Sequence, residues 1–176
     1  LTEQMLRREE KFSGRIISVH VDTVRLPNGE TATREVAGHP GGVAVLPLDA
    51  ENNVLAVTQF RYVFGKPLLE IPAGKLEPGE DPGEAGLREL KEETGAVPGR
   101  YEPMGRILPS PGCYGEILHL YLARDLQMGE QHLDPDEFLN LERVPFDEMV
   151  RRCVSGEIED AKTVAAVLKA KVLLGL

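Results

Sequence analysis

The sequence predicts a mixed α/β (α+β) fold in which a mixed β-sheet lies between helices. Two observations predict it. Short apolar runs bounded by turn residues follow one another along the chain, and segments with helical periodicity lie among and after them. A chain of 176 residues is about one domain's worth, so one main domain with modest additions is expected.

The N-terminal part is expected to form a separate antiparallel sheet. Residues 15–26 and 31–36 have strand character and are joined by Pro27-Asn28-Gly29-Glu30, whose Asn-Gly pair tolerates positive φ. We therefore expect an N-terminal antiparallel sheet extension within residues 1–40 and a main domain over residues 41–176.

The main domain opens with strands. Residues 42–48 and 54–60 are apolar runs separated by a turn composition, and 68–71 is a short strand before Pro72. Both Phe60 and Tyr121 are expected in the core.

A helix is expected over residues 82–94. Asp81 has the character of an N-cap, Pro82 stands at the first helical position, and Gly95 is a typical stop. Beyond it, the pattern predicts strands and helices in alternation. The strands are 101–108, 117–123 and 139–144, and the helices are 146–155 and 161–174, the last one amphipathic.

Composition and charge exclude several classes of protein. A formal net charge of −9 disfavours a general nucleic-acid binder, because cationic contacts hold a polyanion. Cys113 and Cys153 have neither disulfide-framework nor zinc-type spacing. Apolar runs such as 42–48 are far shorter than the ~20 residues that span a bilayer, so we expect no membrane association and a cytoplasmic location.

Three carboxylates share one face of the central helix. Glu89, Glu92 and Glu93 stand at i, i+3 and i+4, where like charges repel one another. A solvated surface is the usual reading of such a trio, whereas a hard divalent cation such as Mg²⁺ would turn the repulsion into coordination. The trio belongs to a longer fixed pattern whose chance occurrence is on the order of one in ten million per start position. That pattern comprises Gly74, Glu80, Arg88, Glu89, Glu92, Glu93 and Gly95.

The segment from Gly74 to Ala96 matches the box of the Nudix hydrolases at every defined position, and the chain resembles this superfamily. The resemblance implies the Nudix fold and two or three Mg²⁺ ions, for which Mn²⁺ can substitute. Glu89 and Glu93, with Glu92 close by and the backbone carbonyl of Ala73, would be the metal ligands. Arg88 resembles the arginine that orients the glutamates. Glu80 would brace the loop.

Outside the box, the chain resembles the ADP-ribose pyrophosphatase branch of the superfamily. The resemblance is carried by Arg34-Glu35-Val36, His39-Pro40-Gly41, Gln59-Phe60-Arg61, Glu70-Ile71-Pro72-Ala73-Gly74, Ser110-Pro111-Gly112, Asp134-Pro135-Asp136-Glu137-Phe138 and Asp160-Ala161-Lys162-Thr163. By resemblance, Arg61 contacts phosphate, Arg34 and Glu35 recognise adenine near a dimer interface, and Glu116 reaches the terminal ribose. As surface residues of strands, Arg34 and Glu35 have an alternative reading without function.

Glu137 is the expected catalytic base, on the acidic loop that resembles the branch's catalytic loop. Two alternatives remain open at this point. Glu137 could be a further metal ligand, with Asp136 or a helix glutamate taking the proton, or it could belong to an ordinary solvated acidic loop. Loop acids can approach the attacking water only in a closed complex.

Together these features predict Mg²⁺-dependent hydrolysis of the pyrophosphate of ADP-ribose to AMP and ribose 5-phosphate. The resemblance further implies a homodimer in which the N-terminal sheet helps complete the partner's adenine pocket. One alternative is the same chemistry on another nucleoside diphosphate sugar. Another, from a different class, is a non-catalytic module that senses a nucleotide, which would be expected to lack one or more box glutamates.

Overall fold

The first of two units is built around an antiparallel sheet at the N-terminus. A computed structural model describes residues 1–133, 135 and 137–175 of the chain. The first unit comprises Leu1–Gly41 and Leu108–Ile117, and the second comprises Gly42–Ile107 and the chain from Leu118 onward.

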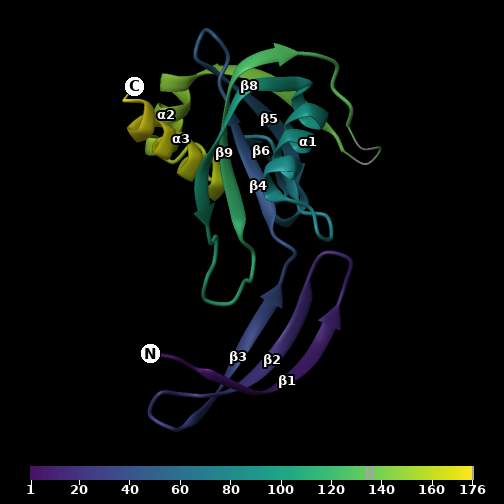
Figure 1. Ribbon diagram of the computed structural model, residues 1–176, viewed down its shortest axis with the longest axis vertical. Coiled ribbons are helices and arrows are strands. Elements are labelled where there is room, and N and C mark those ends of the chain that lie inside the picture. Colours follow the sequence, from purple (N-terminus) through teal and green to yellow (C-terminus); the bar gives the residue numbers. More distant parts are fainter. Residues whose placement is uncertain (134, 136, 176) are drawn as a thin grey trace. The chain divides into compact units, whose positions relative to one another are not determined.

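The sheet of the first unit has three strands, not only the two that the sequence indicated. Its order is β1 (Gln4–Ser13), β2 (Ser18–Arg25) and β3 (Thr31–Gly38) (Figure 1). All ten residues of β1 are exposed, so no apolar alternation marks this strand in the sequence. The segment 108–117 is attached to β3 through Ala37, whose N–H donates to Cys113 and whose carbonyl accepts from Gly115, both at 2.8 Å.

Two sheets form the second unit. One is mixed, with the order β7-β4-β9-β8, and only its central pair β4 and β9 is parallel. The other is antiparallel, with the order β10-β5-β6. Their strands are β4 (Gly42–Pro47), β5 (Asn53–Arg61), β6 (Lys66–Glu70), β7 (Ala73–Lys75), β8 (Ala96–Ile107), β9 (Leu118–Met128) and β10 (Leu139–Pro145), and a short 3₁₀ turn, η1 (Tyr62–Phe64), follows β5.

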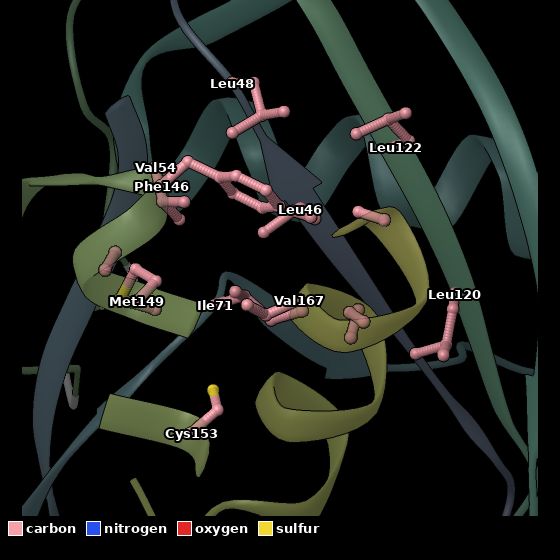
Figure 2. Close-up of a cluster of buried hydrophobic side chains, with 14 of the residues drawn as sticks. Leu46, Leu48, Val54, Ile71, Leu120, Leu122, Phe146, Met149, Cys153 and Val167 are labelled. Atoms are coloured by element: carbon pink, nitrogen blue, oxygen red, sulfur yellow. The ribbon is translucent and has the colours of Figure 1, made fainter. Parts of the chain in front are cut away.

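Helices cover both faces of the mixed sheet, as predicted. α1 (Pro82–Thr94) lies on one side, and α2 (Phe146–Ser155) and α3 (Ala161–Leu174) lie on the other (Figure 1). Alternation along β4 divides the core. Ala44 and Leu46 pack with α2 and α3, whereas Val45 packs with Leu90 of α1. Figure 2 shows the larger cluster, where Phe146, Met149 and Cys153 of α2 lie near Val167 of α3.

Two predictions about aromatic residues differ in their outcome. Tyr121 is half-buried and stacks on Tyr101 with ring centroids 4.7 Å apart. The expectation that Phe60 lies in the core was wrong, since its side chain is 61% exposed. Phe60 stands near the end of β5. Only the first half of this strand is buried, although the apolar run in the sequence extends to Phe60. Within the described residues, no helix combines the length and apolarity required to cross a membrane.

Candidate active site

The helix α1 is fixed at both ends by its sequence. The Asp81 carboxylate accepts hydrogen bonds from the N–H groups of Gly83 and Glu84 at 2.8 and 3.2 Å, which satisfies donors at the first turn. Gly95 adopts the left-handed conformation, with φ of 74°, and ends the helix as predicted. Because Leu90 anchors α1 on the sheet, the neighbouring positions Glu89 and Glu93 are also drawn into the interior.

Glu93 is the most buried of the helix glutamates. Its side chain accepts a hydrogen bond from the backbone N–H of Ala73 at 3.1 Å, and the residue is only 2% exposed. Burial, reinforced by the negative charges of Glu89 and Glu137, raises the pKa of Glu93 to about 8. A buried carboxylate with this environment favours either a proton or a cation.

Glu89 lies against the backbone of the loop that precedes α1. A Cβ atom placed on Gly74 would meet the Glu89 carboxylate carbon at 1.9 Å, so the side chain occupies space that only glycine leaves open. Burial raises the pKa of Glu89 above its ordinary value; Arg88 opposes this rise, whereas Glu92 and Glu137 add to it.

Arg88 connects the loop to the helix face. Its Nε and Nη2 donate to the two Glu80 oxygens at 2.9 and 3.1 Å, while Nη1 donates to Glu89 at 2.8 Å and to Glu92 at 3.0 Å. The hydrogen bonds with Glu80, and next the charge and hydrogen bond of Glu89, raise the pKa of Arg88, whereas burial opposes the rise. Glu80 also accepts from the Glu77 N–H at 2.9 Å, so it braces the loop. Arg88 thereby holds two helix carboxylates in place.

Glu137 lies within electrostatic reach of the same face, because its charge raises the pKa values of both Glu89 and Glu93. The fold thus brings the acidic loop to the helix glutamates from more than forty positions along the chain. Asp136, the alternative base, lies outside the described residues.

Arg61 is held at the end of β5 by a buried partner. Its Nε and Nη2 donate to the two oxygens of Glu70, each at 2.6 Å. Burial opposes the ionisation of Glu70, but the hydrogen bonds from Arg61 and the charge of Lys162 keep its pKa below the ordinary value. Arg61 also acts on Glu93, whose pKa its charge lowers, so the guanidinium lies near the carboxylate face.

The remaining predicted site residues belong to the first unit. Arg34 is half-buried on β3 and pairs with Glu3, its Nε donating at 3.0 Å. Glu35, the next residue, is exposed. The Glu116 carboxylate lies 3.6 Å from Nδ1 of His39.

Two residues next to Arg61 were not proposed as site residues from the sequence, namely Glu70 and Lys162. Lys162 Nζ donates to Glu70 and, at 2.9 Å, to Asp160. Both residues lie within stretches that carry the resemblance, yet a lone glutamate or lysine gives no periodic or spacing signal. A polar residue at a position where the strand pattern demands burial was the signal available for Glu70.

The donor set suits a hard divalent cation. Carboxylate oxygens of Glu89, Glu92 and Glu93 and the backbone carbonyl of Ala73 are oxygen ligands, which Mg²⁺ prefers. In the described part of the chain, no three acidic, histidine or cysteine side chains already converge as a preassembled metal site. Burial, together with nearby negative charges, raises the pKa values of Glu89 and Glu93, and a bound cation would favour the ionised form of both carboxylates.

An open groove flanks this face. It has a volume of about 400 Å³ and is lined by Arg88, Lys91, Glu92 and His132. Loop residue His132 is fixed there, since its backbone N–H donates to the Glu92 carbonyl at 2.9 Å. A volume in this range fits a small-molecule ligand.

Comparison with known families identifies the class of protein that this fold and carboxylate face define. Residues 38–167 match the NUDIX domain, and residues 3–37 match the nucleoside diphosphate sugar hydrolase N-terminal domain. Because the first match covers more than half of the chain, the chain belongs to the Nudix family.

Similar proteins indicate the branch of the family to which the chain is related. It is 45% identical to a methanol dehydrogenase activator of Bacillus methanolicus, over 94% of this chain and 90% of the relative. It is 41% identical to an ADP-ribose pyrophosphatase of Bacillus subtilis, over 95% and 91% of the two chains. A crystal structure of an ADP compounds hydrolase superposes with a TM-score of 0.87 at 21% identity, covering 99% of this chain and 95% of the other, which confirms the fold.

Proposed function

We propose that this Nudix hydrolase cleaves the pyrophosphate of ADP-ribose, giving AMP and ribose 5-phosphate. The observation that carries the proposal is the pair of buried carboxylates Glu89 and Glu93 on α1, whose pKa values the charge of Glu137 raises further and beside which Arg88 donates to Glu89. Such a concentration of negative charge is costly unless cations and a polyphosphate complete it.

The reaction requires water to attack one phosphorus while the P–O bond to the bridging oxygen breaks. When bound, Mg²⁺ would neutralise the diphosphate and lower the pKa of a water molecule. Glu89 and Glu93, with Glu92 and the Ala73 carbonyl, would hold two or three such ions, and Mn²⁺ would be accepted as well.

The remaining chemistry falls to side chains of the chain itself. Glu137 would take the proton of the attacking water, which it can do while ionised. Arg61 would bind a phosphate through its guanidinium, and Arg88 would keep Glu89 and Glu92 oriented. The bridging oxygen leaves with one of the two phosphates, so each product carries a phosphate monoester.

Recognition of the rest of the substrate is assigned to the first unit. Arg34 and Glu35 would bind the adenine, and Glu116 the terminal ribose. In this proposal the chain forms a homodimer that completes the adenine pocket, residues 1–40 serving as the dimerisation region and 41–176 as the catalytic domain. The enzyme would act in the cytoplasm on a small nucleotide, without nucleic acid or membrane partners.

ADP-ribose is favoured as substrate because relatives with ADP-ribose pyrophosphatase names match most of the chain. Another nucleoside diphosphate sugar is the alternative, since a GDP-mannose pyrophosphatase of Yersinia enterocolitica is 31% identical over 94% of this chain. A purely sensing module is disfavoured because Glu89, Glu92 and Glu93 are all present.

Substrate profiling tests the proposal. The purified chain is incubated with Mg²⁺ and ADP-ribose, GDP-mannose, NADH or deoxynucleoside triphosphates, and the products are separated by chromatography. We expect AMP and ribose 5-phosphate from ADP-ribose at the highest kcat/KM. Hydrolysis in ¹⁸O-labelled water shows which phosphorus is attacked. Absence of turnover with all four would refute the enzyme assignment, and preference for GDP-mannose would refute the substrate.

The proposed dimer is tested separately. Light scattering after gel filtration should give twice the chain mass. A mixture of Arg34→Ala chains with Glu137→Gln chains should regain activity if one subunit completes the other's pocket, and a monomer would contradict the arrangement.

A further inference from the structure

A network of four charged residues lies at the meeting point of β5, β6 and α3. We call Arg61, Glu70, Asp160 and Lys162 the Glu70 network. Glu70 accepts from both Nε and Nη2 of Arg61 and also from Lys162, and Lys162 in turn donates to Asp160. Each charge in the network therefore has an opposite charge within hydrogen-bond distance.

Burial makes this network an unusual feature. Glu70 is 1% exposed and Lys162 is 8% exposed, and charges are rarely buried to this extent. Desolvation of two such ions offsets much of their attraction, and apolar residues of similar size often give equal stability. Stability alone therefore does not account for a buried glutamate bonded to two cations at this place.

The geometry of Arg61 indicates what the network does. Glu70 binds the Nε and Nη2 side of the guanidinium, and this side chain remains 37% exposed while its partner is buried. Among the described residues, Nη1 has no hydrogen-bond partner, so its two N–H donors and the second N–H of Nη2 are left for another anion. A guanidinium fixed on one side by a bidentate carboxylate loses little further freedom when it binds.

The backbone between Glu70 and Ala73 joins the network to the carboxylate face. The Ile71 N–H donates to Oγ1 of Thr163 on α3 at 2.9 Å, and the Ala73 N–H donates to Glu93 on α1. Thr163 is itself held by Asp160, the N-cap of α3, through its N–H at 3.0 Å. The residues that hold Arg61 are thus part of the same rigid connection that places Glu93.

From this arrangement we infer that Glu70 and Lys162 are positioning residues, which hold the Arg61 guanidinium ready to bind the diphosphate of the substrate. The inference rests on the proposed function, because it takes the anion to be a diphosphate. It assigns a task to the Asp160-Ala161-Lys162-Thr163 segment, since Lys162 of that segment anchors Glu70, which holds the arginine.

A double-mutant cycle with inorganic pyrophosphate as the probe tests the inference without turnover of ADP-ribose. Binding of pyrophosphate, supplied as its Mg²⁺ complex, is measured by titration calorimetry for the wild type, Arg61→Ala, Glu70→Gln and the double variant. Each single variant should bind about tenfold more weakly. Glu70→Gln should add no more than about a twofold loss in the Arg61→Ala background. Equal losses in both backgrounds, or unchanged affinity in Glu70→Gln, would overturn the positioning role.

Two further variants keep the test decisive if Glu70→Gln does not fold. Glu70→Asp retains the charge but draws the carboxylate back from Arg61, and Lys162→Met leaves the Arg61 pair while removing the anchor of Glu70. Both should weaken pyrophosphate binding, whereas Lys169→Met, at an exposed position of the same helix, should not. Wild-type affinity in both Glu70→Asp and Lys162→Met would refute the inference, whatever the outcome of substrate profiling.

Discussion

The carboxylate of Glu89 occupies the space beside Gly74 where any other residue would place its Cβ atom, 1.9 Å from the carboxylate carbon. Gly74 belongs to β7 and Glu89 to α1, so the close approach fixes the distance between loop and helix. The first residue of the box and its first helix glutamate are therefore a steric pair. This pairing explains why the pattern begins with glycine at a position without a positive φ.

Replacing Gly74 by alanine should displace Glu89 and abolish most of the activity. We expect kcat to fall about 100-fold, because a misplacement of about 1 Å can have that effect. Steady-state hydrolysis and thermal unfolding are measured together. Gly156→Ala is the matched control, since its φ of 79° makes alanine unfavourable by about 1 kcal/mol while open space surrounds it. That control should lose stability and keep its kcat; a fully active Gly74→Ala would contradict the steric argument.

The metal-free protein should become less stable as the pH rises from about 5 to 8. Because burial raises the pKa of Glu93 to about 8, the folded state holds a proton there that the unfolded chain releases near its ordinary pKa of 4.5. Stability from this group is thus complete below pH 4.5 and declines by about 1.4 kcal/mol per pH unit up to pH 8. Chemical unfolding in EDTA between pH 4.5 and pH 8 measures this change in the free energy of unfolding.

Glu93→Gln should flatten that pH dependence, since it removes the titrating carboxylate. Mg²⁺ should stabilise the wild type more at pH 8 than at pH 5, because the ion competes with the proton. Identical unfolding curves at both pH values, for wild type and variant alike, would show that Glu93 is ionised in the folded metal-free chain.

Neutralising the helix glutamates should remove activity without unfolding the chain. Glu92→Gln and Glu93→Gln should each lower kcat at least about 100-fold if cations held there stabilise the charge of the reaction. Glu84→Gln, at an exposed position near the start of the same helix, should be nearly as active as the wild type. Wild-type rates in the Glu92 and Glu93 variants would overturn the metal assignment.

Glu137→Gln distinguishes a proton acceptor from a metal ligand. As the base, Glu137 contributes about 10²- to 10⁴-fold to kcat, with little change in the affinity for Mg²⁺. As a ligand, its loss should weaken Mg²⁺ binding as well, which a metal titration of the activity detects. Glu130→Gln, exposed on the same connection, is the control. Unchanged kcat in Glu137→Gln would transfer the role of base to Asp136 or to a helix glutamate.

The sequence alone predicted the central helix, the family and the branch of this protein. The Gly74 to Ala96 pattern predicted α1 with its cap at Asp81 and its end at Gly95, and it predicted the Nudix family. Residues outside this pattern predicted the ADP-ribose pyrophosphatase branch, and the comparisons confirm both the family and the branch. These features depend on local periodicity, capping and fixed spacing, which are properties of neighbouring residues. Strand β1 was not predicted, because a strand exposed along its whole length has no apolar alternation. The burial of Phe60 was predicted wrongly, because an apolar run in the sequence does not show where the strand stops being covered by other elements.

Tertiary structure alone decided how distant residues meet. It placed the charge of Glu137 near Glu89 and Glu93, bonded Arg61 to Glu70, and brought Lys162 of α3 to the same carboxylate. The physical reason is that burial and charge pairing depend on separations in space, whereas the sequence lists only separations along the chain. The roles of the glutamates could be predicted from one helix, but the raised pKa of Glu93 and the fixed guanidinium of Arg61 exist only once strands and helices have packed.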